Sequence, residues 1–100
     1  MSDSKSTKNA IIEAIDIVGD KWTLLIVREF VISGPRRFLD LQEGLKVSPN
    51  TLSARLKRME RDGLISRKLY SSTPPRSEYV LTDRGHRLEA VLTAINDWAQ

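Results

Sequence analysis

The sequence contains no cysteine among its 100 residues. Within these residues this excludes disulfide bonds, thiol catalysis, thiol-based redox sensing and zinc sites built on cysteine. Only one histidine is present, His86, and a lone histidine is more often a surface residue than a catalyst. No glycine-rich phosphate loop and no plausible serine, histidine and aspartate set is present. We therefore expect neither an enzyme nor a cofactor.

Three acidic residues, Glu13, Asp16 and Asp20, stand at helical spacing. A transition-metal site would also need imidazole or thiolate ligands, and His86 is the one imidazole that the sequence offers. A solvated acidic helix face explains the three carboxylates better. We therefore expect no metal site.

Long apolar runs are also missing, since none approaches the roughly 20 residues that span a bilayer. Residues 1–8 are polar and contain no apolar signal segment. We therefore expect a cytoplasmic protein without a membrane partner. Residues 1–8 are expected to form a disordered tail, and residues 9–100 a single domain.

Positive charge is concentrated in the middle of the chain, although the formal net charge is only +3. From Arg28 to Lys68 there are ten basic and five acidic residues, whereas the remaining residues carry six basic and eight acidic ones. A basic segment between mildly acidic ends favours a polyanionic partner on one face. The alternative on charge alone is a solvated helix face.

Apolar spacing and capping residues predict four helices in the first two thirds of the chain, over residues 9–18, 21–33, 38–45 and 49–62. Asp20 and Ser48 are suitable N-caps, and Pro49 suits the first helical position. Gly34-Pro35 and Gly63 are suitable helix ends. The second range is the most apolar, so it is expected to be the buried central helix.

The last third of the chain predicts a hairpin and a final helix. Residues 64–70 and 77–81 are expected to be strands, joined by a projecting loop over 71–76. Thr82 is expected to cap a last helix. The sequence therefore predicts a mainly α fold with a small β-hairpin, in the order α-α-α-α-β-β-α, which is the winged helix-turn-helix arrangement.

The helix over 49–62 has two distinct faces. Leu52, Leu56 and Met59 form an apolar stripe at helical spacing. The other face carries small, polar and basic side chains near the helix start, where helix-turn-helix proteins contact base edges. The candidate base-reading residues are Asn50, Thr51, Ser53, Ala54 and Lys57. The alternative is an ordinary basic surface helix.

Further polar and basic residues are candidates for contact with the DNA backbone. Those near the two motif helices are Arg36, Arg37, Ser48, Arg58 and Arg61. Those on the hairpin, or wing, are Lys68, Ser72, Thr73 and Arg76. Arg76 is the candidate for a minor groove, where narrow A-tracts strengthen the negative potential. The alternatives are an ordinary charged loop and a polar hairpin tip.

The first and last helices each carry an apolar stripe, although the central helix already supplies most of the core. We interpret these stripes as a homodimer interface, and the alternative is packing within one chain. The candidate interface residues are Ile11, Ile12, Ile15, Leu88, Leu92, Ile95 and Trp98.

The sequence resembles the HxlR-type family of bacterial, MarR-like winged-helix regulators. Gly-Asp-Lys-Trp at 19–22 and Pro-Pro-Arg at 74–76 carry the resemblance most specifically, supported by matches over 16–26, 34–38, 48–64 and 74–82. The resemblance implies a homodimer held by its first and last helices. Two recognition helices would then read a pseudo-palindromic operator in double-stranded DNA.

Many members of that family carry a cysteine just before the first helix, and some sense oxidants or electrophiles through it. In this sequence Asn9 stands at about that place. The resemblance therefore leaves the signal open, and an unidentified small-molecule effector stays among the candidate partners. The alternative to a sequence-specific regulator is a winged-helix module for protein interaction or dimerisation, without specific DNA binding.

Overall fold

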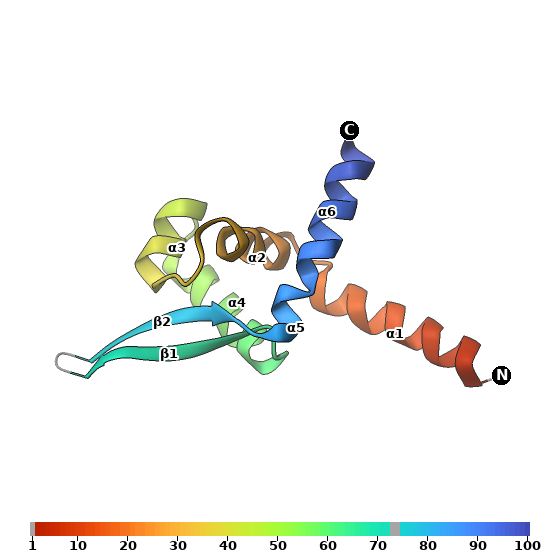
Figure 1. Cartoon of the computed structure of the whole chain (residues 1–100), viewed down its shortest axis with the longest axis horizontal. Helices are drawn as coiled ribbons and strands as arrows, with labels where there is room; N and C mark the ends of the chain where they lie inside the picture. Colours follow the sequence, from red (N-terminus) through yellow and green to blue (C-terminus); the bar gives the residue numbers. More distant parts are fainter. Residues whose placement is uncertain (1, 73–74) are drawn as a thin grey trace.

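The computed structural model describes the backbone of residues 2–72 and 75–100, and the side chains of residues 9–70 and 76–100. In these residues the elements are α1 (Ser2–Val18), α2 (Lys21–Ser33), α3 (Phe38–Leu45), α4 (Pro49–Arg61), β1 (Ile65–Ser72), β2 (Pro75–Leu81), α5 (Asp83–His86) and α6 (Leu88–Ala99). Figure 1 shows α2, α3 and α4 gathered beside the hairpin, while α1 and α6 leave this body in different directions. The predicted winged helix-turn-helix fold is confirmed.

The helix boundaries follow the predicted capping residues. Asp20 accepts hydrogen bonds from the backbone of Trp22 and Thr23 at the start of α2. The Ser48 hydroxyl accepts one from the Thr51 N–H at the start of α4. The turn between α3 and α4 is closed by Lys46 in the left-handed region, with φ of 53°. The helix-turn-helix is therefore built from local signals at each of its ends.

Two expectations for the terminal helices differ from the structure. α1 begins at Ser2, whereas the sequence predicted a helix from Asn9 after a disordered tail. No glycine or proline interrupts residues 2–8, so nothing in the backbone stops the helix from extending. The single expected C-terminal helix is divided at Arg87 into α5 and α6, although Arg87 stays near helical geometry with φ of −64° and ψ of −19°.

The two strands of the hairpin extend further toward its tip than predicted. β1 and β2 pair antiparallel from Ile65↔Leu81 to Ser72↔Pro75, with a register shift between Leu69 and Ser71. The loop expected over 71–76 is therefore wrong at residues 71, 72, 75 and 76, which belong to the strands, while residues 73–74 lie outside the described residues. The proline at position 75 is compatible with this pairing because it is the first residue of its strand, where a missing N–H is tolerated.

The core lies between α2, α4 and the base of the hairpin. Leu52, Leu56 and Met59 are each 1% exposed, so the predicted apolar stripe of α4 is confirmed. α2 contributes Ile26, Val27 and Phe30, but it is not buried on every side, since Leu25 is 39% and Ile32 64% exposed. The core therefore fixes α4 by its inner face and leaves part of α2 uncovered.

Candidate nucleic-acid interface

The outward face of α4 combines polar, small and basic side chains. Asn50, Ala54, Lys57 and Arg61 are exposed, and Thr51 and Ser53 are half-buried beside them. This arrangement follows from the burial of the opposite stripe, because a helix with one buried face presents the other to solvent. All five candidate base-reading residues thus lie on one helix, near its N-terminal half.

An open groove of about 510 Å³ runs along this helix, and it is lined by Asn50, Thr51, Ala54, Arg55, Arg58 and Arg61. Arg55 was not among the residues singled out from the sequence. It is half-buried, and its Nε lies 3.8 Å from the Asp20 carboxylate. Helical spacing over residues 50–61 predicts the outward face of α4. It does not predict the pairing of Arg55 with Asp20, because Asp20 is distant in the sequence and caps α2.

The two arginines before α3 lie in different environments. The Arg36 guanidinium donates to the Asp40 carbonyl at 3.2 Å and lies 3.8 Å from Glu29. Its backbone pairs with Tyr79 of β2 at 3.0 and 2.7 Å. Arg36 is therefore a structural residue at the base of the hairpin, and of the two only Arg37 lies on the surface, with its side chain 51% exposed.

Ser48 and Arg58, two candidates for phosphate contact, are also engaged within the fold. The Ser48 hydroxyl caps α4 and donates to the Thr51 hydroxyl at 2.9 Å. The Arg58 guanidinium donates to the Asp16 carbonyl at 2.5 Å and lies 3.8 Å from Asp62. Arg61 remains exposed on the outer face, so it is the more accessible of the two arginines near the end of α4.

The hairpin presents a second basic surface beside α3. Lys68 and Arg76 are exposed, and a cleft of about 230 Å³ is lined by Arg37, Phe38, Leu39, Tyr70, Arg76 and Ser77. Asp40 and then Tyr70 raise the pKa of Arg37, by hydrogen bonds and by charge. Sequence reasoning did not single out Tyr70. The side chain of Ser72 and the whole of Thr73 lie outside the described residues.

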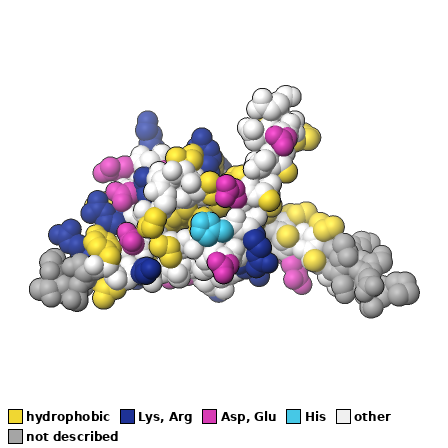
Figure 2. Space-filling model, in the orientation of Figure 1, with side chains coloured by type: hydrophobic (Ala, Val, Ile, Leu, Met, Phe, Trp, Pro, Cys, Tyr) yellow, Lys and Arg dark blue, Asp and Glu magenta, His cyan; other side chains and the backbone are white. Residues whose placement is uncertain are grey.

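The candidate dimer residues separate into an exposed and a covered group. Ile11, Ile12 and Ile15 are 55, 55 and 60% exposed, and Ile95 and Trp98 are 46 and 87% exposed. Leu88 and Leu92 are partly buried and pack against the chain's own core, as the intrachain alternative expects. Figure 2 shows hydrophobic side chains along α6 and on the neighbouring part of α1.

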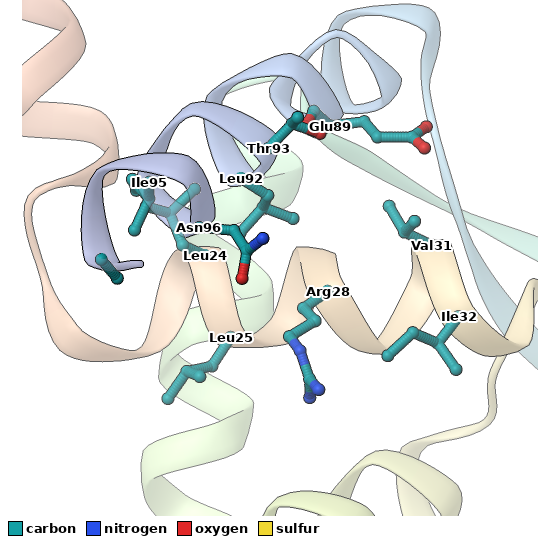
Figure 3. Close-up of a pocket in the computed structure, with 11 residues that line it drawn as sticks. Leu24, Leu25, Arg28, Val31, Ile32, Glu89, Leu92, Thr93, Ile95 and Asn96 are labelled. Atoms are coloured by element: carbon teal, nitrogen blue, oxygen red, sulfur yellow. The ribbon is translucent and has the colours of Figure 1, made fainter.

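Residues of α2 and α6, which pack against each other, line an open groove of about 610 Å³. Leu24, Leu92 and Ile95 lie between the two helices (Figure 3), and Arg28, Glu89, Thr93 and Asn96 are the polar residues that line the groove. The exposed Leu25 and Ile32 also line it. The uncovered part of α2 and the apolar side of α6 are therefore continuous.

Asp20, which caps the start of α2, makes the stability of the fold depend on pH. Burial alone would raise its pKa, but hydrogen bonds from Thr23 and Trp22 and the charge of Arg55 outweigh burial and lower the pKa below 3.8. The ionised form thus stabilises the fold above the ordinary pKa, and this stabilisation is lost as the pH falls through 3.8 and below.

We expect the free energy of unfolding to fall between about pH 5 and about pH 3 by more in the parent protein than in Asp20→Asn. Asparagine retains an oxygen that can cap α2 but has no proton to take up. Urea unfolding at each pH measures the difference, and Asp97→Asn on exposed α6 is the matched control. Parallel pH profiles for the parent protein and Asp20→Asn would contradict the assignment.

Two other kinds of feature, membrane-spanning helices and clusters of metal ligands, are absent from the described part of the chain. In residues 2–72 and 75–100, no helix is long and apolar enough to cross a membrane. Among the side chains of residues 9–70 and 76–100, no three or more histidine, cysteine, aspartate or glutamate groups are arranged to hold a metal ion.

Comparison with known proteins gives a consistent family. The model of the HxlR-like helix-turn-helix family matches residues 17–100. An HTH-type transcriptional regulator of Mycobacterium bovis is 44% identical over 85 residues, which cover 85% of this chain and 53% of the relative. The HTH-type transcriptional regulator YvaP of Bacillus subtilis is 39% identical over 88 residues, covering 87% and 81%. The chain thus spans about half the length of the mycobacterial relative.

Solved structures share the fold. The reduced form of the transcriptional regulator YodB from B. subtilis has a TM-score of 0.82 at 31% identity, covering 90% of this chain and 88% of that chain. The redox regulator HypR in its reduced form has a TM-score of 0.75 at 28% identity, covering 89% and 88%.

Proposed function

The chain belongs to the HxlR-like helix-turn-helix family of transcriptional regulators, and from this premise we propose that it binds a pseudo-palindromic DNA operator as a homodimer. The observation that carries the proposal is the outward face of α4. Asn50, Ala54, Lys57 and Arg61 are exposed there, on a helix whose other face is fully buried. Such a helix can enter a major groove without disturbing the core.

Each residue of that face has a chemistry that suits DNA. Asn50 can pair with both edge groups of an adenine, and Ala54 can lie against a thymine methyl. Thr51, Ser53 and Lys57 flank these positions on the same helix. Arg61, Arg37, Lys68 and Arg76 supply charge for phosphates on either side. The wing and the start of α3 thus support the same binding mode as α4.

The homodimer is proposed from the exposed apolar side chains of α1 and α6. Ile12 and Ile15 on α1 and Trp98 on α6 are exposed apolar side chains that a second copy can cover. The apolar groove lined by α2 and α6 adds to the α6 part of this surface. Two-fold pairing of such surfaces is the commonest way in which soluble proteins self-associate. It would place two α4 helices about one turn of DNA apart.

Selection from a pool of random duplex DNA tests this function directly. We expect the purified protein at physiological salt to recover a motif with two related halves. Recovery of no motif, together with no binding at low salt where phosphate contacts are strongest, would favour a module for protein interaction. Even binding of all duplexes would contradict a sequence-specific regulator.

Asn50→Ala and Arg76→Ala are expected to separate base reading from backbone contact. Asn50→Ala should cost about 1–3 kcal/mol of binding free energy on the selected operator, and should relax the base preference at one position of each half. Arg76→Ala should weaken binding to all duplexes more evenly and reduce the salt dependence. Binding titrations on the operator and on single-base variants measure both effects. Equal base preferences in Asn50→Ala and the parent protein would remove Asn50 from base reading.

A further inference from the structure

The junction between α1 and α2 is tied to α4 by two arginines. Arg55 approaches the Asp20 carboxylate to 3.8 Å, and Arg58 donates to the Asp16 carbonyl at 2.5 Å. The two arginines are one helical turn apart on α4, and their side chains are 29 and 35% exposed. Both therefore reach from the DNA-facing helix to the same short stretch of chain.

The chemistry of the α1 end explains why it attracts cations. The last carbonyls of a helix have no partner inside it, and they carry partial negative charge. α1 has no basic residue in its own last turn. The Ile15 carbonyl accepts from the Gly19 N–H at 2.6 Å, and the next carbonyl, that of Asp16, accepts from Arg58. α4 thus supplies the charge that α1 itself lacks.

The junction has little freedom of its own. The Asp20 carboxylate accepts from the Trp22 N–H at 2.8 Å, the Thr23 N–H at 2.9 Å and the Thr23 hydroxyl at 2.5 Å. Thr23 is only 1% exposed. At Gly19, a Cβ would lie 2.4 Å from the Ile15 carbonyl oxygen, so only glycine fits this close approach. Arg55 is therefore paired with a carboxylate that cannot turn away.

From these contacts we propose that Arg55 and Arg58 are positioning residues that fix the angle between α1 and α4, and so set the spacing between operator half-sites that the dimer accepts. The inference rests on the proposed function. α1 carries the exposed isoleucines and extends away from the body (Figure 1), so its direction is determined at the junction. When α1 pairs with a second copy, a change in this angle moves one α4 relative to the other.

The competing role for the two arginines is direct contact with phosphates. Loss of a phosphate contact weakens binding at every half-site spacing and reduces the salt dependence by about one counterion for each arginine. Loss of a positioning contact leaves the salt dependence unchanged and alters the preference among spacings. These two signatures differ, so one set of measurements distinguishes the roles.

The experiment compares Arg55→Met, Arg58→Met and Lys57→Met in the 100-residue chain. Methionine keeps an unbranched apolar stem. Lys57 lies exposed on the proposed DNA-binding face, so Lys57→Met supplies the comparison for a lost DNA contact, with weaker binding at every spacing and a reduced salt dependence. Affinities are measured on duplexes in which two selected half-sites are separated by a series of spacers, and on a single half-site, at several salt concentrations. Thermal unfolding of each variant establishes that it is folded.

We expect the parent protein to prefer one spacing, and Arg58→Met to reduce that preference by about tenfold with an unchanged salt dependence. Asp20→Asn retains an oxygen able to cap α2, and it should reduce the spacing preference as much as Arg55→Met does. Combining Asp20→Asn with Arg55→Met should reduce the preference little further, because both remove the same contact. Equal weakening at all spacings, or an unchanged profile in both arginine variants, would overturn the proposal. If the parent protein showed no preferred spacing, the proposed function itself, binding of a two-fold operator as a homodimer, would be rejected.

Discussion

Replacing both Ile12 and Ile15 with serine is expected to convert the protein from a dimer into a monomer. The two side chains are 55 and 60% exposed in one copy, so roughly half of the value of burying an isoleucine, about 1 kcal/mol each, is still to be gained on association. In a two-fold dimer each substitution is present in both protomers, so its effect on the interface is doubled. The dimer should therefore lose about 4 kcal/mol, which is about a thousandfold in its dissociation constant.

Sedimentation equilibrium across a concentration series measures this change. Leu39→Ser is the matched control, because Leu39 is 61% exposed on α3 and belongs to neither terminal helix. The double variant should keep the unfolding behaviour of a single chain, since neither isoleucine is in the core. A parent protein that is already monomeric at micromolar concentration would reject the interface, and an unchanged dimer in the variant would reject these residues.

The same variant links association to DNA. A monomer should bind one half-site as the parent protein does, but it should lose the gain from engaging two half-sites at once. Comparing affinities on the full operator and on the isolated half-site therefore distinguishes a lost partner from a damaged α4.

Leu56→Ala is expected to lower the free energy of unfolding by about 3 kcal/mol. Leu56 is 1% exposed, and it lies on the inner face of α4 among the side chains of the core. Truncation removes buried apolar surface and leaves a cavity that the surrounding helices fill only in part. In a small domain this is a large share of the total stability.

Urea unfolding measures the loss, with Leu69→Ala as the control. Leu69 is 61% exposed on the hairpin, so its truncation should change stability by no more than about 0.5 kcal/mol. DNA affinity measured well below the unfolding midpoint should fall far less than stability does, because the outer face of α4 is unchanged. A loss below about 1 kcal/mol in Leu56→Ala would mean that α4 is not held by the core as described.

The sequence predicted well whatever depends on neighbours along the chain. The N-caps Asp20 and Ser48, the glycines that end α2 and α4, and the buried stripe of Leu52, Leu56 and Met59 are all set within one or two helical turns. The two faces of α4 follow from the same periodicity. These features therefore needed no knowledge of the tertiary structure.

Features that depend on distant partners were not predictable in this way. Arg58 is 42 residues from its acceptor, Asp16, so nothing beside it in the sequence indicates that it contacts the end of α1. The backbone of Arg36 pairs with Tyr79, whereas Arg37 lies on the surface. Because the two arginines are adjacent, the sequence does not indicate which of them is held within the fold. Leu88 and Leu92 share a stripe with Ile95, yet only the position of α2 decides which of them is covered.

The pairing of Arg36 with Tyr79 also affects how the sheet behaves toward other molecules. A two-stranded hairpin has two free edges, and unpaired strand edges invite strands from other chains. The backbone of Arg36 occupies part of the β2 edge, close to the base of the hairpin. The β1 strand carries the exposed charges of Arg67 and Lys68, which discourage strand addition. The wing is thereby protected from edge-to-edge aggregation while its basic side chains remain accessible.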